Sequence, residues 1–325
     1  MPPLRQLAPH YLIGSAVRAQ SLATDPEYRH HLQANFNLLV PENSLKCQVV
    51  CQSPQQYNFA AADSIIQFAQ ANNQKVRGHT LCWHISVAKW MKQLNAHDLE
   101  ITLRDYIQTT VGRYKGQCYA WDVVSEVITD RGLPRPSVWK KIEAFIPKCF
   151  QWAHEADPEA QLIYSDYRPH RIFRWNAICK MVSELKRAGI PIHGVGFQVH
   201  QEVFRNLGMS ALRIAPLAKQ LQKQGIAAHV AEISIPIYPP TQQLPQGAKY
   251  ELQAKAYSQL LETALDAGCE SFTVWGFSDR YAFYIPPRCD SRSTPCIMDA
   301  DYQPKPAYGA LQRVLQDRFS AVASS

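Results

Sequence analysis

Eight short apolar segments recur along this chain, and their repetition is the feature that most limits how it can fold. Each is rich in Val, Ile, Leu and aromatic residues, and successive segments begin 25 to 44 residues apart. The segments are Tyr11–Val17, Phe36–Asn43, Lys75–Trp83, Tyr119–Val127, Ala160–Tyr167, His193–His200, Ala227–Ile235 and Ser271–Ser278. Most are separated by stretches with helical periodicity, such as Ala61–Asn72 and Lys249–Ala267. This spacing is typical of strand–helix units in a parallel sheet, so eight units predict an α/β fold, a (β/α)8 barrel.

The chain is expected to form a single domain over residues 1–325. It has no Gly/Ser run, low-complexity tract or long charge block that would mark a linker. Barrels of this length are commonly one domain, and we expect this one to act as a monomer.

Composition argues against two classes of partner. The net charge of +7 comes from dispersed Lys and Arg, so no nucleic-acid patch is predicted. The excess is typical of a solvated surface, with mild attraction for an acidic substrate as the alternative. No apolar run reaches the roughly 18 residues of a membrane span, and Met1–Arg5 lacks the apolar core of a signal peptide. We expect a secreted or periplasmic protein whose leader is absent from this sequence, with a cytoplasmic location as the alternative.

The nine cysteines are an odd number and cannot all pair within the chain. Cys47 and Cys51 share a face if their segment is helical, which is weak support for a metal site. Cys289 and Cys296 flank a polar loop and are candidates for a disulfide. Buried free thiols are expected for most of the nine.

Polar or aromatic residues end or closely follow most of the predicted strands. They are Glu42, Asn43, His79, Trp83, His84, Ser125, Glu126, Asp166, Tyr167, Gln198, His200, Glu232, Trp275 and Asp279. The C-terminal ends of barrel strands meet at one mouth, where the active sites of such barrels lie. These residues therefore predict one site.

Glu126 and Glu232 are the centre of that site. Each follows an otherwise apolar run, and a carboxylate on a buried strand is costly unless it is paired, hydrogen-bonded or functional. They lie 106 positions apart, close to three strand–helix units, which places them across the mouth from each other. Two facing carboxylates suit glycoside hydrolysis, one as a protonated general acid and the other as an ionised nucleophile or base. The alternative is a pair of buried salt-bridge residues.

Histidines and aromatic residues complete the predicted site. His79, His200 and His229 are interpreted as supporting or sugar-binding groups, because a metal needs three or four convergent ligands. No metal or organic cofactor is therefore expected. Trp83 and Trp275 are the best candidates for stacking on sugar rings, whereas most aromatic residues in a barrel fill its core.

At these segments the chain resembles the family 10 glycoside hydrolases, chiefly endo-β-1,4-xylanases, from Tyr11 to Tyr308. The similar segments are Val40–Lys46 ("TPENEMK" in the family), Val76–His84 ("RGHTLVWH"), Trp121–Glu126 ("WDVVNE"), Gly194–His200 ("GIGxQxH"), Ala231–Ser234 ("TELD") and Thr273–Gly276 ("TVWG"). The resemblance implies a retaining hydrolase that acts on xylan or another β-1,4-linked glycan by double displacement.

The resemblance also implies a role for each site residue. Glu126 is the expected acid/base and Glu232 the expected nucleophile, which His200 keeps ionised through a hydrogen bond. The residues expected to hold sugars on the non-leaving side are Glu42, Asn43, Lys46, His79, Trp83 and Gln198. Tyr167 is a further candidate for substrate binding, and Trp275 is expected to form part of the wall at the cleavage point.

Several positions depart from the family pattern. Ser125 and Ser165 each replace an asparagine, Arg168 replaces the second asparagine of "NDYN", Ile85 replaces a serine, Ser234 an aspartate and Phe283 a tryptophan. The asparagine at the position of Ser125 contacts the sugar 2-hydroxyl in the family, a contact that strengthens in the transition state. Two alternatives to a xylanase follow: a hydrolase or transglycosidase acting on another β-glycan or on short oligosaccharides, or a weakly active barrel that binds glycans.

Overall fold

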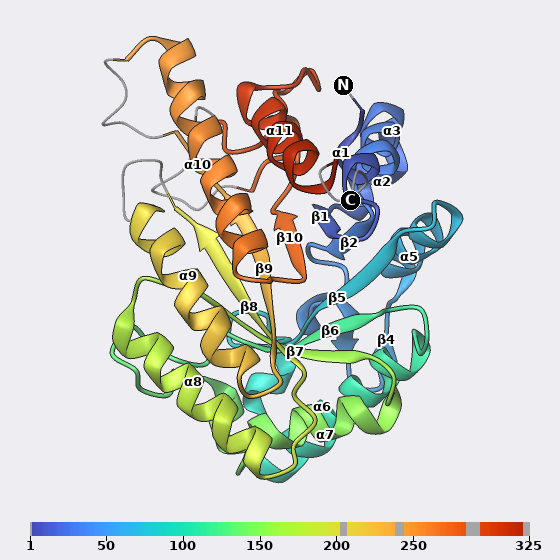
Figure 1. Cartoon of the computed structure of the whole chain (residues 1–325). Coiled ribbons are helices and arrows are strands. Elements are labelled where there is room, and N and C mark those ends of the chain that lie inside the picture. The colour runs from blue at the N-terminus through green and yellow to red at the C-terminus, as the bar shows by residue number, and fades with distance from the viewer. Residues whose placement is uncertain (1, 202–206, 238–243, 284–292, 321–325) are drawn as a thin grey trace.

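In the computed structural model, eight parallel strands close into a barrel (Figure 1). The structure describes residues 2–201, 207–237, 244–283 and 293–320. The barrel strands are β1 (Leu12–Val17), β2 (Leu38–Pro41), β5 (Lys75–Trp83), β6 (Ala120–Ser125), β7 (Gln161–Tyr167), β8 (Gly194–His200), β9 (Ala227–Ser234) and β10 (Ser271–Val274). They pair in chain order, and β10 closes the ring against β1. The predicted (β/α)8 barrel is therefore confirmed.

Helices alternate with the strands and surround the barrel (Figure 1). They are α1 (Leu4–Leu7), α2 (Ala19–Thr24), α3 (Pro26–Asn35), α4 (Cys47–Val50), α5 (Ala60–Ala71), α6 (Ala96–Arg113), α7 (Phe145–Ala156), α8 (Ile172–Arg187), α9 (Leu207–Gln222), α10 (Gln246–Asp266) and α11 (Pro306–Ser320). A short antiparallel hairpin, β3 (Cys51–Ser53) and β4 (Gln56–Tyr57), lies between α4 and α5 and was not predicted.

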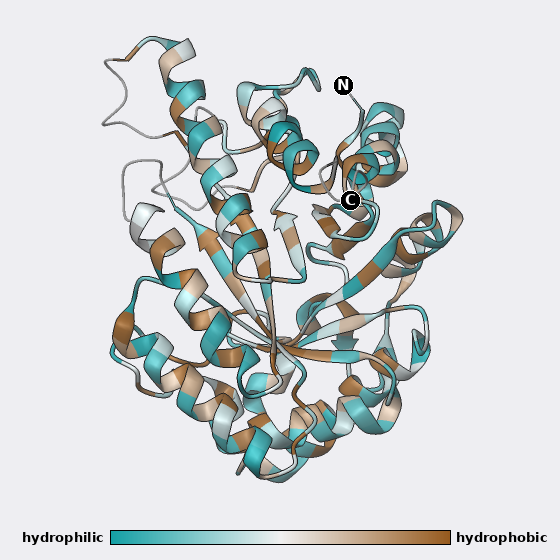
Figure 2. Ribbon diagram, in the orientation of Figure 1, coloured by the Kyte–Doolittle hydropathy of each residue, from teal (hydrophilic) through white to brown (hydrophobic). Residues whose placement is uncertain are grey.

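Helical periodicity explains how the outer layer packs. In α5 the buried residues are Ala62, Ile65, Ile66 and Ala69, which recur at the spacing of one helix face. Figure 2 shows hydrophobic residues along the central strands and mixed hydrophilic and hydrophobic residues on the surrounding helices. Burial of these apolar faces against the strands holds the helices in place.

Some strands are shorter at their C-terminal ends than the apolar runs indicated. β2 ends at Pro41, before Glu42, and β6 ends at Ser125, before Glu126. Glu126 has a backbone φ of 58°, a left-handed conformation uncommon for any residue but glycine, so the chain turns sharply out of the sheet there. Glu42 and Glu126 therefore begin loops of the mouth, whereas Trp83, Tyr167 and His200 end their strands as predicted.

A row of buried polar residues crosses the inside of the barrel beneath the mouth. The Arg77 Nε lies 3.3 Å from the Asp122 Oδ2, and both side chains are fully buried. The same carboxylate oxygen lies 2.8 Å from the His79 Nδ1, and an Arg77 NH2 group donates to the Ala231 carbonyl at 2.7 Å. The row therefore ties β5, β6 and β9 together from the inside.

One of the two cysteines named as candidates for a disulfide, Cys289 and Cys296, can be described. Cys296 is a buried free thiol, and Cys289 lies outside the described residues. The other seven cysteines within the described ranges are also buried and free, as the sequence indicated. Within those ranges, no helix is both long and apolar enough to cross a membrane.

Candidate active site

Glu126 stands at the mouth because β6 ends one residue before it. Its amide donates to the Ser165 carbonyl on β7 at 2.9 Å, and its own carbonyl accepts from the Arg135 Nε at 2.7 Å. These two bonds fix the left-handed turn from both sides. The turn therefore holds the half-buried side chain of Glu126 in one position at the mouth.

The surroundings of Glu126 favour its protonated form. Burial, followed by the negative charges of Asp166 and Glu232, raises the pKa of Glu126 to about 8. The nearby Trp83 indole and the Arg135 charge act in the opposite direction but do not outweigh these effects. A carboxyl group with this pKa still holds its proton at neutral pH and can donate it to a substrate.

Glu232 lies on β9, three strands around the ring from β6, in a different environment. Its Oε2 lies 2.9 Å from the His200 Nε2, and the His200 Nδ1 lies 2.8 Å from the Ser234 hydroxyl. Its Oε1 has no hydrogen-bond partner among the described residues. One carboxylate oxygen is thus held by an imidazole while the other remains available to a substrate.

The buried row under the mouth orients His79 between two carboxylates. Although burial opposes ionisation of Asp122, the Arg77 charge and the hydrogen bond with His79 outweigh it and lower the pKa of Asp122. The ionised Asp122 holds the His79 Nδ1 at 2.8 Å, whereas that nitrogen lies 4.0 Å from the Glu232 Oε1. Asp122 therefore fixes the imidazole at the edge of the site.

A chain of polar contacts forms the wall of the mouth beyond β2. The Glu42 carboxylate pairs with the Arg18 Nε at 2.8 Å and accepts from the Asn43 amide at 3.0 Å. The Asn43 Oδ1 in turn accepts from the Lys46 Nζ at 2.9 Å, and that ammonium lies 4.8 Å from the centre of the Trp83 ring. Burial lowers the pKa of Lys46, against the opposing effect of Glu232, Glu42 and Glu126. The wall thus presents charged and amide groups beside an aromatic ring, a combination suited to sugars.

Ser125 is buried and already engaged below the mouth. Its hydroxyl lies 2.9 Å from that of Thr80, and the Thr80 hydroxyl donates its only proton to the Asp122 carbonyl at 2.9 Å. Because each hydroxyl has one proton, Ser125 must donate to Thr80 in this arrangement. The Ser125 hydroxyl can then only accept a hydrogen bond from a ligand.

We therefore expect Ser125→Asn to raise kcat on xylohexaose, by roughly tenfold and by more than it lowers KM. The longer amide supplies a donor for the sugar 2-hydroxyl, and a transition-state hydrogen bond contributes on the order of 1–3 kcal/mol. Steady-state kinetics with a thermal unfolding control decide the matter. An unchanged or lower rate with the fold intact would mean that Ser165, Ile85 and Phe283 have adapted the pocket to a serine.

The remaining predicted residues are more deeply buried among neighbouring side chains than the sequence suggested. Trp275 is only 3% exposed, and its ring meets those of His79 and His200 edge-on at 5.0 and 6.2 Å. Gln198 is buried and donates to the Ser165 hydroxyl at 3.3 Å. His229 is a buried core residue that contacts Ser271, where burial lowers its pKa to about 3.

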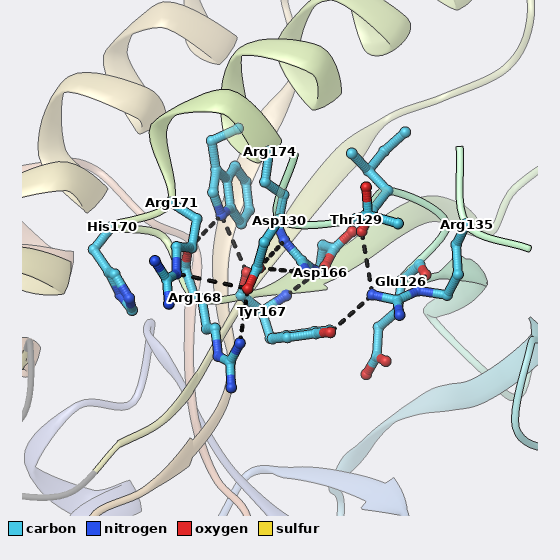
Figure 3. A network of polar contacts seen from close by, with 12 residues as sticks. Glu126, Thr129, Asp130, Arg135, Asp166, Tyr167, Arg168, His170, Arg171 and Arg174 are labelled. Carbon is cyan, nitrogen blue, oxygen red and sulfur yellow. Dashed lines mark hydrogen bonds and ion pairs between the residues drawn. The ribbon is translucent and has the colours of Figure 1, made fainter. Parts of the chain in front are cut away.

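Tyr167 lies at the centre of a polar network at the end of β7 (Figure 3). Its hydroxyl accepts from Arg135 at 2.8 Å, and the Arg174 guanidinium carbon lies 3.9 Å from its ring centre. Arg174 also donates to Asp166 at 2.5 Å and to Asp130 at 2.7 Å. The network therefore links Glu126, through Arg135 and Tyr167, to the beginning of α8.

Sequence reasoning missed several of these groups. Asp122 and Arg77 carry charges within apolar strands, and the argument used for Glu126 and Glu232 would have found them. Arg135 lies in a proline-containing loop with no periodic pattern, so no sequence signal places it behind Glu126. Within the described ranges, no group of three or more His, Cys, Asp or Glu side chains is arranged to hold a metal ion.

Comparisons with known proteins agree with this geometry. The profile of glycosyl hydrolase family 10 matches residues 4–314. A β-1,4-xylanase from Dictyoglomus thermophilum is 33% identical over 321 residues, which cover 95% of this chain and 90% of that protein. The structure of native xylanase 10B from Thermotoga maritima superposes with a TM-score of 0.89 at 31% identity and covers 98% of this chain and 99% of that one. Xylanase 10B from Thermotoga petrophila RKU-1, in complex with xylobiose, has the same TM-score and identity and covers 98% of each chain. The chain therefore belongs to glycosyl hydrolase family 10 and is a glycoside hydrolase.

Proposed function

We propose that this barrel is an endo-β-1,4-xylanase that hydrolyses xylan or xylo-oligosaccharides with retention of configuration. The observation that carries the proposal is the contrast between two carboxyl groups at one mouth. Burial and neighbouring charges raise the pKa of Glu126 to about 8, so this group is protonated at neutral pH. The His200 imidazole contacts one oxygen of Glu232 at 2.9 Å. Retaining glycosidases need such a pair, about 5 to 5.5 Å apart.

In the proposed reaction, the Glu232 carboxylate attacks the anomeric carbon while Glu126 gives its proton to the departing sugar oxygen. The bond between the anomeric carbon and that oxygen breaks, and a glycosyl ester forms on Glu232. Glu126, now ionised, then takes a proton from water, whose oxygen attacks the same carbon and releases Glu232. His200 stabilises the carboxylate whenever Glu232 is free.

The order of anomers released tests this mechanism. Proton NMR during the first minutes of xylohexaose cleavage should show the β-anomer of the new reducing end before mutarotation adds the α-anomer. Initial release of the α-anomer would mean inversion and would contradict the proposal.

The activity should be lost as the pH rises through about 8. Glu126 must carry its proton to assist the leaving group, and it is protonated below its pKa and ionised above it. We expect the alkaline limb of kcat/KM on xylohexaose to fall tenfold per pH unit beyond that point. The same limb should disappear for an aryl xyloside with a good leaving group, since that substrate needs no proton. An alkaline limb of equal position and slope for both substrates would assign it to another group.

The proposed partner is xylan or a shorter β-1,4-linked xylo-oligosaccharide, bound by one chain acting as a monomer and a single catalytic domain. The described residues of the site all come from one barrel, which supports this proposal. Polymeric xylan would be met outside the cytoplasm, so we propose a secreted or periplasmic enzyme. A cytoplasmic enzyme would instead act on short oligosaccharides, and the ratio of activity on xylan to that on xylotriose separates the two cases.

A further inference from the structure

An unusual concentration of positive charge lies beside the mouth, at the beginning of α8. The arginines are Arg135, Arg168, Arg171 and Arg174, and they surround Tyr167, Asp130 and Asp166 (Figure 3). Among the described residues, three of these guanidinium groups pair with the two carboxylates, and the fourth, that of Arg135, donates to the Tyr167 hydroxyl. The cluster remains positive even when the neighbouring Glu126 is ionised.

Two of these arginines have a structural task, and two have spare capacity. Arg174 is 1% exposed, and each of its three guanidinium nitrogens donates to Asp130 or Asp166. Arg135 donates to the Glu126 and Ile128 carbonyls and to the Tyr167 hydroxyl. The side chains of Arg168 and Arg171 are 31% and 48% exposed. Arg168 makes one side-chain hydrogen bond, to Asp130 at 2.9 Å, and Arg171 makes only an ion pair with that residue at 3.7 Å, counting described partners. A guanidinium has five N–H donors, so most of theirs remain available.

The position of these charges opposes local stability. Arg171 is the residue that precedes α8, and the first turn of that helix has no acidic residue. The positive end of a helix dipole disfavours cations, and among the described residues only Asp130 pairs with Arg168 and Arg171, whereas Arg174 is shared between Asp130 and Asp166. Two exposed arginines that share one carboxylate at this helix end break a local rule, and such departures are expected at functional sites.

The cluster lies on the side of Glu126 where the leaving part of a glycan would run. The wall of Glu42, Asn43 and Lys46 follows β2. In the ring, β5 and β6 lie between β2 and β7, and Glu126 directly follows β6. Figure 3 shows Arg168 and Glu126 extending toward the same side of the network, with the Tyr167 ring between them. If the non-leaving sugars occupy the first wall, the leaving sugars pass over Tyr167 and reach Arg168.

We propose that Arg168 and Arg171 bind the carboxylate of an acidic sugar substituent, such as a glucuronic acid branch, on the leaving part of the glycan. This inference rests on the proposed function as a retaining xylanase. A planar carboxylate matches the fork of a guanidinium, and such charge-assisted bonds are about twice as strong as neutral ones. The enzyme would therefore cleave xylan with acidic branches more efficiently than neutral xylan.

The test compares two xylo-oligosaccharides of the same shape. One carries a single glucuronic acid branch, and the other carries its methyl ester, which has nearly the same bulk but no charge. We expect kcat/KM to be about tenfold higher for the acid. Mass spectrometry of the products should place the branch on the leaving fragment. The preference should decline as NaCl is raised, because both arginines are partly exposed.

In the double variant R168Q/R171Q the ratio of acid to ester should fall to about one. Arg187→Gln, at the exposed opposite end of α8, makes a single charge change on the same helix and should keep the ratio. A wild-type ratio near one, or a ratio that R168Q/R171Q leaves intact, would overturn the proposal. If the double variant does not fold, the exposed Arg171→Gln alone should lower the ratio about threefold, and no change would count against the proposal.

A binding measurement separates this inference from the proposed function. Calorimetric titration of the wild-type protein with non-cleavable thio-linked versions of the acid and the ester needs no catalysis. If xylohexaose is not cleaved at all, the proposed function fails, whereas tighter binding of the acid than of the ester still supports the arginine site. Equal binding of both compounds refutes the site whatever the activity.

Discussion

Glu232→Gln should lower kcat on xylohexaose by at least about 10⁴-fold. An amide cannot form the glycosyl ester, so the covalent route of a retaining enzyme is lost with one substitution. The fold should persist, because the glutamine oxygen can still accept from His200, which lies 2.9 Å from the Glu232 Oε2. Steady-state rates together with thermal unfolding curves check both parts of the prediction.

The matched control is Glu262→Gln, which makes the same chemical change on the exposed side of α10. It should retain the wild-type rate within about twofold, since surface substitutions of this kind have small effects. A Glu232→Gln protein that is folded and keeps a tenth of the activity would remove Glu232 from the reaction.

Glu126→Ala should divide substrates by their leaving groups. Cleavage of xylohexaose should fall by about 10²- to 10⁴-fold, the usual contribution of a positioned general acid. A good aryl leaving group departs without receiving a proton, so formation of the glycosyl ester from an aryl xyloside should be nearly unaffected. Hydrolysis of that glycosyl ester should slow, because no base remains to activate water.

Azide provides the decisive measurement for this variant. The space left by the glutamate side chain admits a small anion, which can attack the glycosyl ester without a general base. Turnover of the aryl xyloside should therefore rise with azide concentration, and the product should be a β-glycosyl azide. Equal slowing of both substrates with no response to azide would withdraw the assignment of Glu126.

The barrel and its carboxylate pair could be predicted because strong physical constraints act on them. Eight buried parallel strands need apolar runs at regular intervals, and a charge within such a run, as at Glu232, is conspicuous. The ends of β5, β7 and β8 at Trp83, Tyr167 and His200 were predicted correctly, but the end of β6 was not. The predicted run Tyr119–Val127 continues past Ser125 to an apolar Val127, and the bonds to Ser165 and Arg135 hold the turn of the chain at Glu126.

The supporting contacts could not be predicted for a related reason. The engagement of Ser125 with Thr80 depends on which hydroxyl proton points where, which a residue pattern does not encode. The arginines around Tyr167 meet through side chains from two loops and a helix, and each alone resembles an ordinary surface charge. Sequence patterns report burial well, but they report poorly which polar groups pair with each other.

The buried row of Arg77, Asp122 and His79 has a consequence for directed evolution. The fully buried Asp122 contacts both the Arg77 guanidinium and the His79 imidazole. Removing Arg77 would leave the interior Asp122 carboxylate without its permanently charged partner. A random library that includes these positions would be filled with unfolded members and would reveal little about specificity. Diversity confined to the loops after β6 and β7, with Glu126 kept, leaves the row untouched, so most members should fold and differ in the glycan they accept.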